Sequence, residues 1–233
     1  TAENIAAKWG ISREAQDAFA VESHKRAINA IEKGYFKDQI LPVEIKSKKG
    51  STFFATDEHA RADASAECIA KLRAVFQNDG SVTAGNASGI NDGAAAIVMM
   101  EKTAAEKRGL KPMARLISYG HAGVDPKYMG IGPVPAVQKA LAKVDLKVSD
   151  MDVIESNEAF AAQACAVSKD LGFDGKKTNP NGGAVALGHP IGATGAILTI
   201  KALYELERIG GRYALVTMCI GGGQGIAAVY ERT

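Results

Sequence analysis

From about residue 112 onward, predicted β-strands alternate with predicted helices, and this alternation constrains the fold more than any other feature of the sequence. The helices at 135–144 and 157–171 carry apolar residues on one face, and glycines close the helices at 157–171 and 195–209. Strands separated by helices of this length are typical of a layered α/β domain. The predicted strands are 114–119, 151–155, 213–218 and 225–230, with a short extended segment at 184–187.

The first 112 residues have a different character. Helical patterns cover residues 1–9 and 12–33, with Ser12 as an N-cap and Gly34 at the end of the second helix. Residues 40–46 alternate like a strand, whereas 50–80 are rich in loops with short helical signals near 66–75. The continuous apolar run 94–100 predicts a strand buried on both faces, and a short helix is expected at 103–108.

Composition excludes several classes of protein. The 233 residues are 46% hydrophobic and 23% charged, as in ordinary globular proteins, and a net charge of +2 offers no basic surface for nucleic acid. No apolar run approaches the roughly 20 residues that span a bilayer, so no membrane association is expected. The three cysteines lie far apart, form no disulfide framework or metal-binding pair, and favour a reducing, cytoplasmic compartment.

The first segment with chemical potential is 155–160, where a predicted strand ends and a helix begins. Asn157 lies at that boundary, where side-chain polar atoms meet the free backbone N–H groups of a helix start. Asparagine is also a favoured helix cap, so a purely structural role stays open at this point.

The second segment, 179–195, holds His189 among five glycines. Pro190 keeps His189 out of helical conformation, so the imidazole is held by the backbone of a tight connection. Such a histidine can act as an acid, a base or a hydrogen-bond donor. A histidine on an ordinary surface loop is the alternative.

The third segment, 218–225, follows an apolar strand and contains Cys219 before a run of glycines. Backbone N–H groups of the glycines can gather in one concave place, where they would lower the pKa of the thiol or hold an oxyanion. A buried structural cysteine is the alternative. The order Asn157, His189, Cys219 lacks the flanking signatures of cysteine proteases, and no phosphate-binding or dinucleotide-binding glycine motif is present.

Together, these segments resemble the C-terminal catalytic motifs of the thiolase family. The motifs are NEAFAAQ at 157–163, NPNGGAVALGHPIGATGA at 179–196 and CIGGGQG at 219–225. The upstream segments TAENIAAKW and GNASGINDGAAA are similar to thiolase sequence as well, so the resemblance runs over the whole chain. It is nearest to bacterial acetyl-CoA acetyltransferases and β-ketothiolases, and it implies the thiolase fold, a layered α/β/α arrangement with mixed sheets.

The resemblance implies a reversible Claisen condensation of acetyl-CoA with an acyl-CoA, or thiolysis of a 3-oxoacyl-CoA. His189 would activate the nucleophile and line an oxyanion hole, Asn157 would hold a water there, and Cys219 would be the general acid/base. The Gly221 N–H would face the acyl-enzyme carbonyl. Coenzyme A and acyl-CoA are expected as substrates, with no permanently bound cofactor and no metal. The residues implied in substrate binding are Arg61, Ser88, Gly89, Met129, Ala159 and Phe160.

One part of the family pattern is missing. Thiolases carry their acyl group on a second cysteine in an N-terminal half, and neither Cys68 nor Cys165 stands in that motif. We expect residues 1–90 to be the loop domain, 91–112 the last strand and helix of the N-terminal half, and 113–233 the C-terminal domain. Without neighbours, the run 94–100 would expose an apolar edge, so a second polypeptide is expected to supply the rest. A homotetramer is expected.

Two competing functions stay open at this stage. A non-catalytic subunit that binds CoA or serves as a scaffold would share the fold, but it has no need of Asn157, His189 and Cys219 together. A decarboxylating ketoacyl synthase also shares the fold, but it typically carries a histidine where Cys219 stands.

Overall fold

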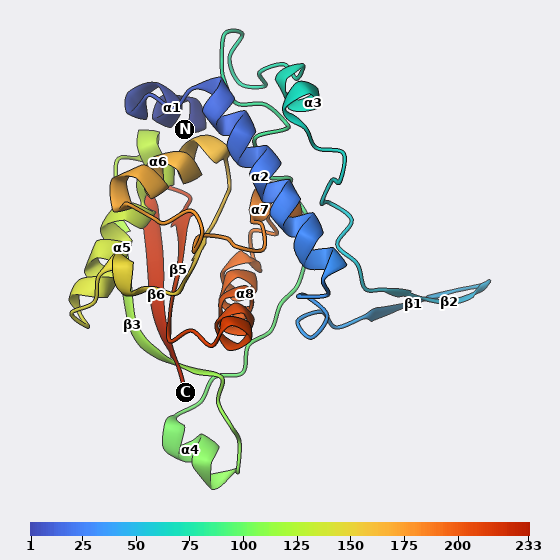
Figure 1. The fold of residues 1–233 in the computed structure, drawn as a ribbon, viewed down its shortest axis with the longest axis vertical. Helices are drawn as coiled ribbons and strands as arrows, with labels where there is room; N and C mark the ends of the chain where they lie inside the picture. The colour runs from blue at the N-terminus through green and yellow to red at the C-terminus, as the bar shows by residue number, and fades with distance from the viewer.

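The computed structural model describes all 233 residues, and its centre is a four-stranded mixed sheet (Figure 1). The strands follow the order β3-β6-β5-β4 across the sheet. β4 and β5 run parallel, whereas β6 is antiparallel to both of its neighbours. This arrangement confirms the predicted α/β class. The strands are β3 (Ala114–Gly123), β4 (Val153–Ser156), β5 (Tyr213–Ile220) and β6 (Gln224–Arg232).

Helices cover both faces of this sheet. On one face, α5 (Pro133–Ala142) packs against Ile154 and Leu215, and on the other α8 (Thr194–Ile209) packs against Val153 and Val216. Neighbouring residues of a strand point to opposite faces, so each strand feeds two apolar clusters. The run of buried apolar residues in β4 and β5 therefore marks a sheet covered on both sides.

The N-terminal helices lie over the end of the sheet where β4 and β5 terminate (Figure 1). α1 (Ala2–Trp9) packs on α6 (Ala161–Leu171), and α2 (Arg13–Glu32) packs on α6 and on the short α7 (Ala184–Leu187). The Ser12 hydroxyl accepts the Ala15 N–H at 3.2 Å, which confirms the predicted cap. No helix combines the length and the apolar composition that a bilayer crossing requires. The remaining short helices are α3 (Ala66–Ala70), α4 (Lys102–Lys107), η1 (Pro126–Ile131) and η2 (Val148–Asp150).

Two predictions of local structure are wrong. Residues 184–187 form a helical turn, α7, and not an extended segment: the Leu187 and Gly188 N–H groups donate to the carbonyls of Gly183 and Ala184. A short apolar run between glycines does not distinguish a strand from a helix. Residues 50–54 form strand β2 (Gly50–Phe54) and not a loop. It pairs with β1 (Val43–Ser47) in an exposed hairpin that projects from the body (Figure 1).

The apolar run 94–100 is the largest departure from expectation. It forms no strand and pairs with no other strand, and its side chains are mostly exposed; Val98 is 85% accessible. The predicted strand buried on both faces is therefore wrong for the chain as it stands, because nothing in it lies against either face of the run. Beyond it, the loop that carries α4 stands away from the body (Figure 1).

Candidate active site

Asn157 and Cys219 lie at the same edge of the sheet because their strands are parallel neighbours. Ser156, the last residue of β4, is level with Thr217 in β5, and the Asn157 N–H donates to the Thr217 carbonyl at 2.9 Å. Asn157 therefore follows the end of β4 close to the level at which β5 reaches Cys219. The carboxyl ends of adjacent parallel strands are a common position for binding and catalytic groups.

His189 reaches the same place from the loop behind α7. Asn157 Nδ2 lies 3.3 Å from His189 Nε2, although 32 residues separate the two in sequence. Gly188, just before His189, has φ +92°, a backbone conformation that glycine adopts without strain. The structure therefore joins two of the three reactive side chains singled out in the sequence.

The hydrogen bonds of Thr194 determine which ring nitrogen of His189 carries the proton. The Thr194 hydroxyl donates to the Pro190 carbonyl at 2.9 Å, so its oxygen can only accept from His189 Nδ1, which lies 2.7 Å away. His189 Nε2 then holds the free lone pair in the neutral ring and faces Asn157. Burial lowers the pKa of His189, which favours that neutral form.

Asn157 is not a helix cap. Helix α6 begins at Ala161, with Phe160 at the cap position, and Asn157 lies in the buried connection before it. The Asn157 backbone carbonyl accepts from Gln163 Nε2 at 2.8 Å. The Asn157 side-chain oxygen is buried and has no hydrogen-bond partner. A buried polar atom left open next to an imidazole is a natural binding point for a water or a substrate group.

The environment of Cys219 contradicts one expectation. Burial raises the pKa of its thiol to about 11, against the lowering we expected from the glycine backbone. The thiol is therefore protonated at neutral pH. No hydrogen bond links it to His189 or Asn157. Gly221 lies in the exposed turn after β5, and the space where its side chain would stand is open.

The residues expected along the CoA arm and in the acyl pocket come together around the start of α6. The Ser88 N–H and hydroxyl both donate to the Ala159 carbonyl, at 3.0 and 2.9 Å, and Ala87 forms an antiparallel bridge with Phe160. A Cβ at Gly89 would come within 2.7 Å of the side chains of Asn91 and His59, which would have to move to accept it. The structure thus brings together four of the predicted substrate-binding residues.

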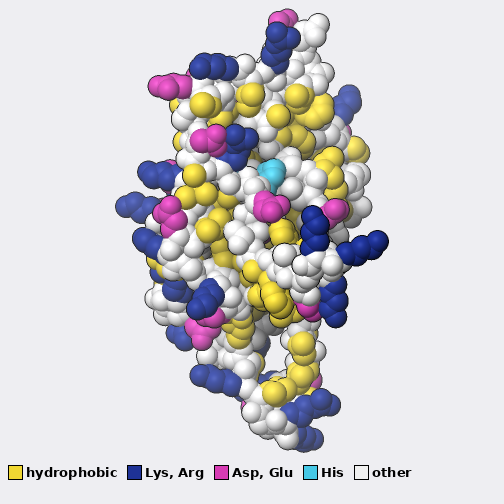
Figure 2. Space-filling model, turned by 90° about the vertical axis from the view of Figure 1, so that its right-hand side faces the viewer, with side chains coloured by type: hydrophobic (Ala, Val, Ile, Leu, Met, Phe, Trp, Pro, Cys, Tyr) yellow, Lys and Arg dark blue, Asp and Glu magenta, His cyan; other side chains and the backbone are white.

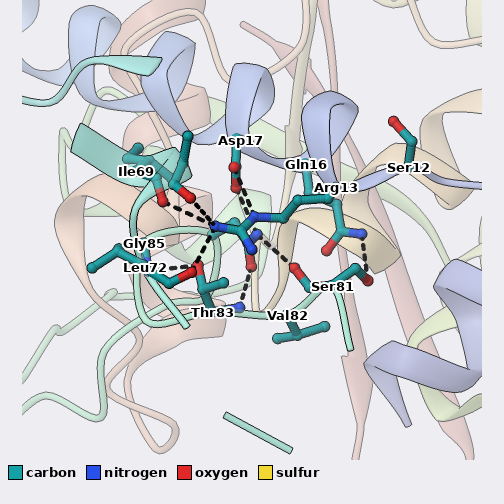
Figure 3. A network of polar contacts seen from close by, with 12 residues as sticks. Ser12, Arg13, Gln16, Asp17, Ile69, Leu72, Ser81, Val82, Thr83 and Gly85 are labelled. Carbon is teal, nitrogen blue, oxygen red and sulfur yellow. Dashed lines mark hydrogen bonds and ion pairs between the residues drawn. The ribbon is translucent and has the colours of Figure 1, made fainter. Parts of the chain in front are cut away.

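A polar network anchors the loop before Ser88 (Figure 3). Asn86 donates to Asp17 at 2.8 Å, and Asp17 accepts from Arg13 at 2.7 Å. Arg13 Nη2 also donates to the carbonyls of Ile69 and Leu72, at 2.9 and 3.0 Å. Helix α2 therefore holds two separate loops through one guanidinium group.

Arg61 and Met129 lie outside these hydrogen-bonded groups. The Arg61 side chain is exposed and pairs with Asp63 at 3.0 Å, while its backbone N–H donates to the buried ring of His24 at 3.2 Å. Met129 lies half-buried in η1. Neither residue forms a hydrogen bond or ion pair with His189 or Asn157.

Sequence analysis missed Asn91 and Thr194, which both fix His189. Asn91 Oδ1 accepts the His189 N–H at 3.2 Å, and a side chain at Gly188 would come within 2.5 Å of Asn91. Asn91 is 98 residues away from His189 in sequence, so spacing carried no signal. Thr194 stands five residues after His189, and its place in the motif was the available hint.

Comparison with known proteins places this site in a family. The C-terminal domain of thiolase matches residues 110–232, and the N-terminal domain of thiolase matches residues 1–103. Among curated relatives, a beta-ketothiolase of Cupriavidus necator is 67% identical over 233 residues, and an acetyl-CoA acetyltransferase of Escherichia coli is 53% identical over 232. The chain is covered entirely in both cases and spans 59% of each relative.

Solved structures agree with these relatives. The crystal structure of an acetyl-CoA acetyltransferase from Bacillus anthracis matches the whole chain with a TM-score of 0.98 at 51% identity. A human mitochondrial 3-ketoacyl-CoA thiolase in complex with CoA matches with a TM-score of 0.93 at 47% identity. This chain spans 59% and 58% of those two chains. The predicted thiolase fold is confirmed, and the chain belongs to the thiolase family.

Proposed function

We propose that the chain is the C-terminal part of a thiolase that condenses acetyl-CoA with an acyl-CoA, or cleaves a 3-oxoacyl-CoA with CoA. The observation that carries the proposal is the 3.3 Å approach of Asn157 Nδ2 to His189 Nε2, beside an unpartnered Asn157 oxygen. This pair lies at the edge of the sheet where Cys219 stands near the end of β5. Acyl transfer between thioesters needs a base and preorganised donors for a developing oxyanion.

His189 acts as the base for the nucleophilic cysteine. Because Thr194 holds the proton on Nδ1, Nε2 carries the lone pair, and the proton of an incoming thiol would replace the Asn157 Nδ2–H that Nε2 accepts at rest. The imidazolium that results presents an Nε2–H to the thioester oxygen. The pKa of the ring, which burial lowers, keeps the base unprotonated at neutral pH before substrate enters.

Asn157 completes the oxyanion site by holding a water through its open side-chain oxygen. That water and His189 would donate to the enolate oxygen of acetyl-CoA. The Gly221 N–H would serve the carbonyl oxygen of the acyl-enzyme. Removing one donor of this kind typically costs about 3 kcal/mol of transition-state stabilisation.

Cys219 works in two steps that follow from its raised pKa. At rest it is a thiol, so it first donates its proton to the CoA thiolate that leaves when the acyl group moves to the nucleophile. The Cys219 thiolate that remains then removes the proton from the α-carbon of acetyl-CoA. The enolate attacks the acyl group, and the nucleophile's thiolate leaves and recovers a proton from His189.

Substrate contacts come from the residues around α6 and α2. Ser88 and Gly89 would line the pantetheine arm, and Ala159 and Phe160 would line the acyl pocket with Met129. The exposed guanidinium of Arg61 would meet the nucleotide end of CoA. The CoA complex of the human relative supports the substrate class.

An N-terminal thiolase segment supplies the nucleophilic cysteine, in the same or a separate polypeptide. The relatives are longer than this chain, and hydrophobic side chains gather on the face that carries residues 90–101, down to the loop with α4 (Figure 2). In this assignment residues 1–90 are the loop domain, 91–112 complete the N-terminal half and 113–233 form the C-terminal domain. We place the assembly, a homotetramer, in the cytoplasm, consistent with three free cysteines.

The test is acylation followed by condensation. The chain is assembled with the N-terminal segment of its Cupriavidus necator relative, mixed with acetyl-CoA and analysed by mass spectrometry. We expect an acetyl group on a cysteine outside these 233 residues, and loss of condensation by about 10²–10⁴-fold in Cys219→Ser. Cys68→Ser, a change at an exposed cysteine, is the control and should keep full activity. An acetyl group on Cys219 would contradict its assigned role.

The same experiment separates the main alternative, a non-catalytic CoA-binding subunit. Such a subunit would bind CoA equally well before and after Cys219→Ser, and neither form would produce acetoacetyl-CoA. Binding without turnover in the assembled enzyme would therefore replace the proposal.

A further inference from the structure

The Asn157–His189 pair depends on two segments that have no covalent connection near the site. Asn157 follows β4 directly, whereas His189 follows the loop 179–183 and the single helical turn α7. The separation of the two side chains is therefore set by whatever joins the end of β4 to that loop.

Asn179, at the start of the loop, accepts the Ser156 N–H at 2.9 Å and donates to the Ser156 carbonyl at 2.8 Å, and Lys201 adds a second connection from α8. Lys201 Nζ donates to Glu155 Oε2 at 2.8 Å and to the Gly182 carbonyl at 2.5 Å. Glu155 lies in β4, two residues before Asn157, and Gly182 lies just before α7. One ammonium group thus holds both segments. It stands two turns after Thr194 on α8, so the face of the helix that fixes the His189 ring also fixes the loops behind it.

The surroundings of Lys201 are dry and rich in carboxylates. The Lys201 side chain is 6% exposed and the Glu155 side chain is fully buried. Glu158, also buried, accepts from Ser23, Asn179 and the Val185 N–H. Burying a charge costs free energy unless the charge is paired and hydrogen-bonded. The two bonds of the Lys201 ammonium group therefore offset the cost of burying it.

One side-chain oxygen of Glu155 lacks a hydrogen-bond partner. This favours a role of the Lys201–Glu155 ion pair in positioning the chain over a role in stabilising it. Glu155 Oε1 is buried without any partner. Burial, the largest cause, raises the pKa of Glu155 to about 7 despite the nearby Lys201, and Glu158 and Glu205 raise it further. A buried ion pair of this kind is weak support for stability, whereas it does specify one arrangement of the chain.

We propose that Lys201 is a positioning residue of the thiolase reaction: by holding Glu155 and Gly182 together, it sets the distance between Asn157 and His189. The inference rests on the proposed function for its kinetic consequences, but the geometry it predicts can be measured without turnover. Lys201 touches no reacting atom, so its loss should reduce kcat and leave the KM for CoA thioesters unchanged.

The kinetic test uses Lys201→Met in the assembled enzyme. A displacement of about 1 Å between reacting groups costs on the order of 100-fold in rate, and we expect a fall in kcat of that size. Lys177→Met is the matched control, because Lys177 donates to the Met151 carbonyl just before the opposite end of β4 and should keep its kcat. A kcat within twofold of the wild type in Lys201→Met would overturn the proposal.

The double variant Lys201→Met with Glu155→Gln separates positioning from folding. It removes both charges together, so the buried site is neutral again and the melting temperature should return toward that of the wild type. The bond to the Gly182 carbonyl stays absent, so kcat should stay low. Recovery of kcat together with the melting temperature would show a purely structural role and would sink the proposal. If the single variant does not fold, the double variant decides alone.

A measurement without turnover distinguishes failure of this inference from failure of the proposed function. NMR titration of the His189 ring reports its pKa in each variant. Burial lowers the pKa of His189, so a loop displaced by Lys201→Met should let water reach the ring and move the His189 pKa upward, toward its ordinary value of 6.5. An unchanged His189 titration would refute the positioning role even in an inactive assembly. A shifted titration without any condensation in the wild type would refute only the proposed function.

Discussion

Leu215 and Val98 are both apolar, but one side chain is buried and the other is exposed. Leu215, in the centre of β5, is fully buried between the sheet and α5. Val98, in the run 94–100, is 85% exposed, and the run forms no strand. The run 94–100 predicted a strand buried on both faces, and residues 213–218 predicted a strand. The difference lies in whether the chain contains the elements that cover them.

This comparison distinguishes a region whose apolar side chains are covered by other parts of the chain from a segment whose apolar side chains are not. The two apolar clusters on the faces of the sheet draw only on residues between 113 and 233, whereas the candidate active site at the sheet edge also uses Asn91, which fixes His189. The run 94–100 has the composition of a core strand without a core around it. An exposed apolar patch of this kind marks a binding surface. The covered region carries Asn157, His189 and Cys219.

The largest effect expected from this contrast is on the free energy of unfolding. Leu215→Ala removes buried methyl groups and leaves a cavity, so it should destabilise the chain by about 2–5 kcal/mol. Val98→Ala should change stability by less than about 0.5 kcal/mol, because its side chain is exposed. Urea unfolding followed by circular dichroism measures both. Equal costs at the two sites would remove the distinction between the regions.

A second effect concerns pH, because the buried carboxyl groups of Glu155, Glu158 and Glu205 lie in the covered region. The Glu155 pKa of about 7 exceeds its ordinary value of 4.5, so the folded chain binds that proton more tightly than the unfolded chain. Glu155 therefore stabilises the folded chain at low pH. Its contribution to the free energy of unfolding falls by about 3 kcal/mol as pH rises from about 4.5 to about 7.

The measurement compares unfolding free energies across that range in the wild type and in the double variant Lys201→Met with Glu155→Gln. Groups common to both proteins cancel in the difference. We expect the double variant to lack this decline. A parallel decline in the two proteins would show that Glu155 titrates normally.

The smallest effect should appear in association. Val98→Lys places a charge on the exposed run, and we expect it to weaken binding of the N-terminal thiolase segment by about tenfold or more, since the charge would be buried there unpaired. Ile209→Lys is the control, because Ile209 is also exposed but ends α8. Titration calorimetry measures both. Equal binding by the two variants would place the partner elsewhere.

Much of the fold could be predicted from local patterns. The helix at Arg13–Glu32 has a cap and a glycine at its end, and the strands β3 to β6 have apolar runs of the right length. The prediction for residues 184–187 was wrong because four apolar residues between glycines fit either a strand or a helix. The hydrogen bonds to the Gly183 and Ala184 carbonyls make this segment a helical turn. The motif residues Asn157, His189 and Cys219 stood out because each has a reactive side chain at the end of an element.

The sequence by itself determined which residues alternate, where helix Arg13–Glu32 begins and ends, and which side chains carry reactive groups, since these depend on near neighbours along the chain. Only the tertiary structure decided that Asn91 and Lys201 hold His189 and its loop, because those contacts join residues 98 and 19 positions apart in the sequence. It also decided that the Cys219 thiol is protonated and that Val98 is exposed. Burial depends on everything that surrounds a residue, and no local pattern contains that information.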